Sequence, residues 1–456
     1  MQAGKPDQAV PIYRELATAF PREPSFGINL AIAQYKAHFY RDAIRECEAL
    51  LKLQPNLFPA WLFLGASQLE LGDAASAGET LKRAVDLNPA DRNARLMLAD
   101  ALLAGERNAD AATQFEEANG MMPDNPRVLY GLERSYEALA IEASDRLERA
   151  APGSPEMAAL TGDFELERAQ FARALQRYRQ ALAARPNFRG VHESISQIYE
   201  KTGHADWALA ERQNEKRDTP DCRSQPLECQ FAAGHFREAA KAVASAPGEV
   251  YWQARAFLHL SRQAYERLQE LPPSREKYEA AARVAERSGR WPEAAAAWRE
   301  ALKLAPGDTK IPQKLAVALC RSNDCVSALP FLKDSLAQDP SSAELNFLYG
   351  VALSGTQDAR RALAYLEAAV KLDGSLLDAR ASLGEAYLEA GEPERAIPQL
   401  EKAVAEDQDG TRHYQLARAY QAAGEPEQAA AALREYREIM RRGEAAKADD
   451  ARITPP

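Results

Sequence analysis

The sequence lacks the features that would mark a membrane protein or a familiar enzyme. No apolar run approaches the roughly 18 residues of a membrane-spanning helix, and the first ten residues contain no apolar signal-peptide core. No glycine-rich phosphate loop and no H-E-x-x-H motif occurs, and none of the six histidines accompanies a serine or cysteine catalytic signature. We therefore expect no catalytic residues, no metal site, no cofactor and no membrane span.

Basic residues do not gather into a run either. The 456 residues include 57 Lys and Arg against 67 Asp and Glu, which gives a formal charge of −10. The two signs are mixed along the chain, whereas a nucleic-acid-binding surface needs a basic stripe or patch. We therefore expect no nucleic-acid partner.

What the sequence does contain is a recurring spacing, which is clearest in residues 58–91. A Gly-Asp break at 72–73 separates two segments of helical periodicity. Two such helices cannot bury both apolar faces alone, so they require neighbours. Seven residues of this stretch carry the spacing: Trp61, Leu64, Gly65, Ala77, Leu81, Ala84 and Pro89.

This spacing resembles the tetratricopeptide repeat, a 34-residue helix–turn–helix unit with the pattern W-x2-L-G … A-x3-F … P. The resemblance implies an all-α fold, a right-handed α-solenoid in which the units stack into a superhelix. Small residues recur at the eighth position of each unit, and alanine recurs at the twentieth, as expected where two helices approach closely. Clear units begin at Pro24, Phe58, Arg92, Pro155, Arg189, Arg275, Thr309, Ala343, Leu377 and Gly410.

Two segments, 126–152 and 247–273, lack the turn between the two helices, and we predict that each forms one fused long helix. Tyr130 and Tyr136 recur as Tyr251 and Phe257, at an offset of 121, so a block of three units is duplicated. We expect the fused helices to change the superhelix pitch locally; a functional hinge is the alternative.

These patterns divide the chain into seven segments. Residues 1–23 carry only the second-helix spacing, so we expect a half repeat whose first helix lies upstream in a longer natural chain. Residues 221–246 form a short unit bracketed by cysteines, and residues 442–456 lose periodicity, which predicts a disordered tail. The remaining segments are repeat units at 24–125, a fused helix with two units at 126–220, the same arrangement at 247–340, and repeat units at 341–441.

The five cysteines include two close pairs at turns. Cys222 and Cys229 bracket one turn, and Cys320 and Cys325 bracket another. We predict two local disulfides, which require alpha carbons within about 7 Å and persist in oxidising compartments. The alternative is four reduced thiols in a cytosolic protein. A metal site at the first pair lacks a fourth ligand.

The resemblance also implies a concave groove, lined by the adjacent face of each first helix. In the N-terminal units this face is unusually apolar, which is typical of a partner site. Shielding of these leucines by further repeats or by superhelix packing is the alternative. In the C-terminal units the face is more acidic, with Glu344, Asp378 and Glu385. The predicted N-terminal groove consists of Ile28, Ile32, Tyr35, Leu62, Ala66, Leu69, Asn93, Leu96, Asp100 and Leu103.

Together these features predict a non-enzymatic scaffold that binds a protein or peptide in the groove. The cysteine-bracketed unit and the fused helices resemble exported tetratricopeptide proteins of acidobacterium-like bacteria, which implies a periplasmic or secreted location, with the cytoplasm as the alternative. A second possibility is the substrate-recruiting arm of a larger enzyme or of a secretion or envelope assembly complex. The sequence leaves the oligomeric state open.

Overall fold

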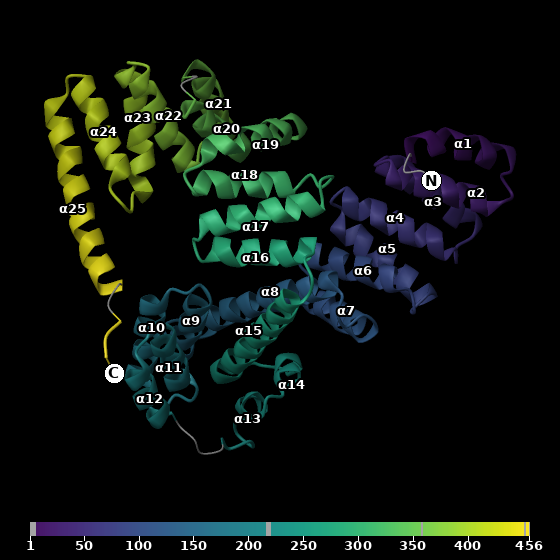
Figure 1. Cartoon of the computed structure of the whole chain (residues 1–456), viewed down its shortest axis with the longest axis horizontal. Helices are drawn as coiled ribbons and strands as arrows, with labels where there is room; N and C mark the ends of the chain where they lie inside the picture. Colours follow the sequence, from purple (N-terminus) through teal and green to yellow (C-terminus); the bar gives the residue numbers. More distant parts are fainter. Residues whose placement is uncertain (1–5, 216–219, 357–358, 451–452, 456) are drawn as a thin grey trace. The chain divides into compact units, whose positions relative to one another are not determined.

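The computed structural model describes residues 6–215, 220–356, 359–450 and 453–455 (Figure 1). Over these ranges the chain forms helices α1 to α25, one short 3-10 helix and no strand. The predicted all-α solenoid of helix pairs is therefore confirmed. None of the helices in the described ranges is both long and apolar enough to cross a membrane.

The chain divides into two compact units, each made of two separate stretches of sequence. Unit 1 comprises Met1–Leu160 and Asp218–Pro272, and unit 2 comprises Thr161–Arg217 and Pro273–Pro456. The boundary between the stretches falls inside α9 (Pro155–Glu167).

Helices of unit 1 belong to the N-terminal repeats, to the two fused segments and to the short cysteine-bracketed unit. They are α1 (Pro6–Ala19), α2 (Pro24–Lys36), α3 (Tyr40–Leu53), α4 (Phe58–Glu70), α5 (Ala74–Leu87), α6 (Arg92–Ala104), α7 (Asn108–Met121), α8 (Pro126–Ala150), α13 (Pro226–Ala232), α14 (Phe236–Lys241) and α15 (Pro247–Glu270).

Helices of unit 2 belong to the remaining repeats. They are α10 (Phe171–Ala184), α11 (Val191–Lys201), α12 (Ala205–Asn214), α16 (Arg275–Arg287), α17 (Trp291–Leu304), α18 (Ile311–Arg321), α19 (Cys325–Gln338), α20 (Ala343–Ser354), α21 (Ala359–Leu372), α22 (Leu377–Glu389), α23 (Pro393–Ala403), the 3-10 helix Val404–Glu406, α24 (Thr411–Ala422) and α25 (Pro426–Asp450).

The predicted break at 72–73 shows how a repeat turns between its two helices. Gly72 adopts a φ of 84°, a left-handed conformation that glycine enters without steric cost. Asp73 then caps α5, because its side chain accepts a hydrogen bond from the amide of Ser76 at 3.1 Å. One short sequence thus ends α4 and starts α5.

Small residues allow the paired helices to approach, as the register predicts. A Cβ atom added at Gly65 in α4 would lie 2.6 Å from Cγ of Leu81 in α5, so no larger residue fits without a shift. The alanines at the twentieth position are all buried, at 7 % exposure or less: Ala43, Ala77, Ala111, Ala174, Ala208, Ala294, Ala328, Ala362, Ala396 and Ala429.

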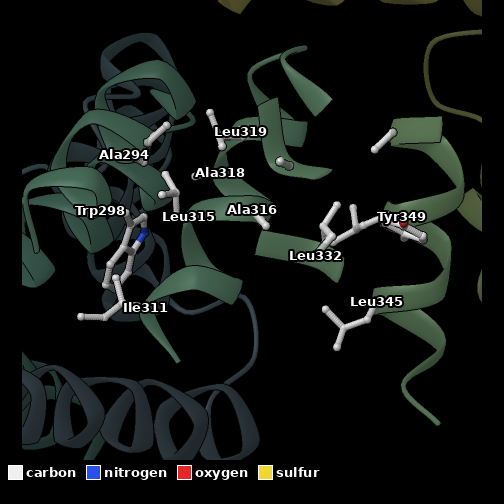
Figure 2. Close-up of a cluster of buried hydrophobic side chains, with 14 of the residues drawn as sticks. Ala294, Trp298, Ile311, Leu315, Ala316, Ala318, Leu319, Leu332, Leu345 and Tyr349 are labelled. Carbon is white, nitrogen blue, oxygen red and sulfur yellow. The ribbon is translucent and has the colours of Figure 1, made fainter. Parts of the chain in front are cut away.

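Apolar side chains then fill the space between successive helices, as Figure 2 shows for α17 to α20 of unit 2. Trp298 and Leu315 lie close together there, and Leu332 lies toward Tyr349 on the next helix pair. Trp298 is 4 % exposed and places its indole nitrogen 2.7 Å from a carboxylate oxygen of Glu286. Each helix therefore contributes to a core shared with its neighbours.

The two fused segments form uninterrupted helices, α8 and α15, as predicted. They pack against each other within unit 1, a contact that the repeat register does not predict. The helices run in opposite directions, because contacts that move forward along α15 move backward along α8. Tyr136 faces its own duplicate Phe257, with ring centroids 6.4 Å apart. The duplicated helices thus form a pseudo-twofold pair about these two rings.

Both predicted cysteine pairs lie at disulfide distance. The alpha carbons are 5.5 Å apart for Cys222 and Cys229, and 4.0 Å apart for Cys320 and Cys325. Cys47 is free and buried. The first pair flanks the start of α13, and the second spans the turn between α18 and α19.

The two ends of the chain follow the predicted segments in part. Helix α1 packs on α2 through Ala9 and Val10. The C-terminal segment differs from the expectation, because α25 continues past Arg441 to Asp450.

Candidate functional site

The predicted groove lies in unit 1, on the first helices of three successive repeats. Helices α2, α4, α6 and then α8 pack side by side, so one face of each contributes to a continuous surface. Seven predicted residues are half-buried on it, and Asn93 is exposed. The half-buried residues are Ile28, Ile32, Tyr35, Leu62, Leu69, Asp100 and Leu103.

Two predicted groove residues do not present their side chains to solvent. Ala66 is 2 % exposed and Leu96 is 4 % exposed, so both belong to the packing between neighbouring helices. The apolar surface open to a partner is therefore narrower than the sequence predicts, and Leu62 and Leu69 of α4 lie at its middle.

An aromatic cluster lies in this region, on α2, α3 and α4. The ring of Tyr35 lies 5.6 Å from that of Phe63 and 5.7 Å from that of Tyr40. Burial and the nearby Glu70 carboxylate together raise the pKa of Tyr35 to about 12. A hydrogen bond with the Glu70 side chain adds to this effect, so the Tyr35 hydroxyl is held within the cluster.

An ion pair between Asp100 and Arg127 lies near the aromatic cluster. Nε of Arg127, at the start of α8, donates to a carboxylate oxygen of Asp100 at 2.9 Å. Arg127 also lies near enough to act on Tyr35, where its positive charge lowers the pKa against the effect of burial. The surface thus combines apolar side chains with one charged pair.

The corresponding first-helix face of the C-terminal repeats lies on α20 and α22 of unit 2. It is less acidic than its sequence indicates. Asp378 pairs with Arg412 at 2.6 Å, and Glu385 accepts a hydrogen bond from the Gln415 amide at 3.1 Å. Burial raises the pKa of Glu385. Neighbouring repeats therefore compensate part of the negative charge.

A hollow that the sequence did not reveal lies between α7, α8, α14 and α15, with a volume of about 420 Å³. Glu116 dominates its polar wall, since it accepts from Tyr136 at 2.6 Å and from Lys241 at 2.5 Å. Burial and the Glu116 hydrogen bond raise the pKa of Tyr136. Glu116 and Tyr136 meet on the neighbouring helices α7 and α8, but the opposite wall comes from α14 and α15. Only the pairing of α8 with α15 supplies that wall, and repeat spacing carries no signal for this pairing.

Among the residues that the structure describes, no group of three or more His, Cys, Asp or Glu side chains is placed to hold a metal ion.

Sequence comparison agrees with the repeat register. Models described as tetratricopeptide repeat match residues 28–92, 68–134, 279–343, 353–415 and 413–439. The chain is built of tetratricopeptide repeats. Proteins with these repeats mediate protein–protein interactions.

Several known proteins are similar to parts of this tetratricopeptide repeat chain. The Hsp70-Hsp90 organizing protein of Triticum aestivum is 30 % identical over 99 residues, which make up 22 % of this chain and 17 % of that protein. The MamA crystal structure is 23 % identical and covers 40 % of this chain and 98 % of its own, with a TM-score of 0.31. The Cut9-Hcn1 structure is 14 % identical and covers 96 % and 91 %, with a TM-score of 0.35.

Proposed function

We propose that the chain is a non-enzymatic scaffold whose unit 1 groove binds a peptide segment of a partner protein. The observation that carries this proposal is the row of half-buried apolar side chains across α2, α4 and α6. Such a row offers sites for apolar anchors of a helical or extended peptide, and an exposed apolar strip commonly marks an interaction surface.

The Asp100–Arg127 pair lies at one end of the groove and would set the orientation of a bound peptide. A bound peptide would bury its apolar anchors on Leu62 and Leu69, while the Asp100–Arg127 pair faces its polar groups. We infer that the preferred peptide combines two or more apolar anchors with one polar or charged residue near α8.

We further propose that the protein works in an oxidising compartment outside the cytoplasm. Support comes from the two cysteine pairs at disulfide distance, both in turns or at helix starts, because such bonds persist where thiols are not kept reduced.

The groove proposal is tested with a display library of random twelve-residue peptides, selected on the oxidised full chain. We expect the enriched peptides to carry at least two apolar anchors. Leu62→Lys should weaken their binding by at least about tenfold, measured by calorimetry, because a charge replaces an apolar contact.

The matched control is Leu209→Lys on α12, where the leucine is 57 % exposed and lies in unit 2. This variant should bind like the parent, and circular dichroism should show that both variants remain folded. Selected peptides that bind the Leu62→Lys and parent proteins equally would contradict the groove proposal.

A further inference from the structure

Residues 453–455 of the chain lie against α10 and α11 in unit 2 (Figure 1). Nη2 of Arg179 donates to the carbonyl oxygen of Thr454 at 2.8 Å and to that of Pro455 at 2.6 Å. The hydroxyl of Tyr199 donates to the same Thr454 carbonyl at 2.8 Å. Nη1 of Arg179 also donates to the Thr454 hydroxyl.

The receiving side of this contact is part of the folded repeats. Tyr199 is completely buried and stands 5.5 Å from the ring of Trp207. Arg179 is half-buried and donates to the Tyr199 hydroxyl at 3.0 Å. Two side chains from two successive helices are thus held together and directed at one non-helical segment.

The chemistry of the contact is recognition of a main chain. A guanidinium group carries several donors in a fixed planar arrangement, which suits two carbonyl oxygens in succession. Hydrogen bonds from a charged donor are stronger than neutral ones. Proline at 455 has no amide hydrogen and a restricted φ, so it keeps the segment out of a helix.

We propose that Arg179 and Tyr199 form a second peptide site, specific for an extended proline-containing segment, and that Ile453–Pro455 of the same chain occupies it. This site is separate from the unit 1 groove and takes a different kind of ligand. Because the segment is tethered, its effective concentration reaches the millimolar range. An external peptide of the same kind therefore binds only when the chain's own segment leaves.

The test uses a fluorescent peptide with the sequence of residues 450–456, DARITPP. Its binding is measured by anisotropy to the full chain and to a chain that ends at Asp450, which keeps α1 to α25. We expect the shortened chain to bind at least about tenfold more tightly than the full chain, because the tethered competitor is gone.

Arg179→Met in the shortened chain should weaken peptide binding by at least about tenfold, since the charged donors to both carbonyls are lost. The control is Arg177→Met on the same helix, because Arg177 pairs with Glu165 at 3.7 Å, whereas the contacts with the segment come from Arg179. Arg177→Met should bind like the shortened parent.

Tyr199→Phe supplies a milder variant, which keeps the buried ring and removes only the hydroxyl donor; it should weaken binding less than Arg179→Met. Equal affinity of the full and shortened chains, no binding to the shortened chain, or binding unchanged by Arg179→Met would overturn the proposal. Leu62→Lys should leave this binding unchanged, so the outcome is independent of the unit 1 groove.

Discussion

A single glycine illustrates how tightly the repeats are packed. Gly131 of α8 faces Phe115 of α7, and a Cβ atom added there would lie 2.2 Å from the Phe115 ring. Phe115 is completely buried, so its ring has no free space to move into. The size limit at this position therefore comes from packing, and the backbone of Gly131 is ordinary helix.

We expect Gly131→Ala to lower the free energy of unfolding by about 1–3 kcal/mol through overpacking. Gly120→Ala on α7 is the control, because no atom lies within 4 Å of its added Cβ. That control should be neutral or stabilising by up to about 1 kcal/mol, since alanine favours helix over glycine. Urea midpoints of the two variants measure the difference, and equal midpoints would contradict the packing argument.

A second residue-level feature is the pair formed by His192 and Glu211 in unit 2. The hydrogen bond with the Glu211 carboxylate raises the pKa of His192 above its ordinary value of about 6.5. The folded protein therefore holds the proton more tightly than the unfolded chain does. The resulting stabilisation is fully present below the unfolded value and is lost as pH rises through the raised pKa.

We therefore expect the parent to lose thermal stability relative to His192→Gln between about pH 6 and pH 8. The measurement is the difference in Tm between the two proteins at matched pH values. A difference that stays constant over this range would show that the pair does not couple protonation to folding.

At the residue scale, the sequence predicts contacts set by the repeat register and misses those set by superhelix geometry. The small residue at Gly65 and the buried alanines follow from the spacing alone. The burial of Ala66 and Leu96 does not follow from the spacing, because it depends on how closely the first helices of successive repeats pack. The contact of Arg179 with the segment at Thr454 joins residues far apart in the chain, and no local pattern encodes it.

At the scale of the element, the pairing of α8 with α15 is the main departure from a simple repeat array. Leu147 and its duplicate Leu268 are both completely buried. The two helices use the same apolar face because one sequence block is a copy of the other, and a face that fits its own duplicate gives an antiparallel pair with approximate twofold symmetry.

We expect Leu147→Ala and Leu268→Ala each to destabilise the protein by about 2–5 kcal/mol, as buried leucine deletions do. Ile141→Ala on α8 is the matched control, because Ile141 is 47 % exposed. Ile141→Ala should lower the free energy of unfolding by much less than either leucine variant does. Urea unfolding measures all three, and an Ile141→Ala cost equal to the leucine variants would contradict this assignment of the buried face.

The sequence predicts both long helices, since helical periodicity continues through each missing turn. It does not predict that they meet. The duplication shows that their faces are alike, but likeness does not specify contact. The hollow beside Glu116 and Tyr136 is closed by residues of α14 and α15, so the sequence does not predict it.

At the scale of the whole molecule, the oxidation state of the cysteines depends on the compartment in which the chain folds. The pKa of the Cys47 thiol is raised to about 12, chiefly by burial, so this thiol is unreactive in the folded protein. The other four cysteines lie in the two pairs at disulfide distance.

We expect a thiol assay on protein made in an oxidising compartment to detect no reactive thiol in the native state. After denaturation without reductant the assay should detect only Cys47, and after reduction all five cysteines. Five reactive thiols before reduction would remove the support for an extracytoplasmic location.

The antiparallel contact between α8 and α15 also has a mechanical consequence. A stretching force applied to the chain ahead of α8 and beyond α15 would load this helix pair directly. Because the pair is antiparallel, the two loaded ends lie side by side, and residues 151–246 would carry no tension until the helices had peeled apart from that end. Rupture of the pair would then release slack on the order of 300 Å if that stretch is drawn out fully. The duplicated helices would thus hold the intervening residues slack until they separate. Force spectroscopy would record their separation as an extension of the chain.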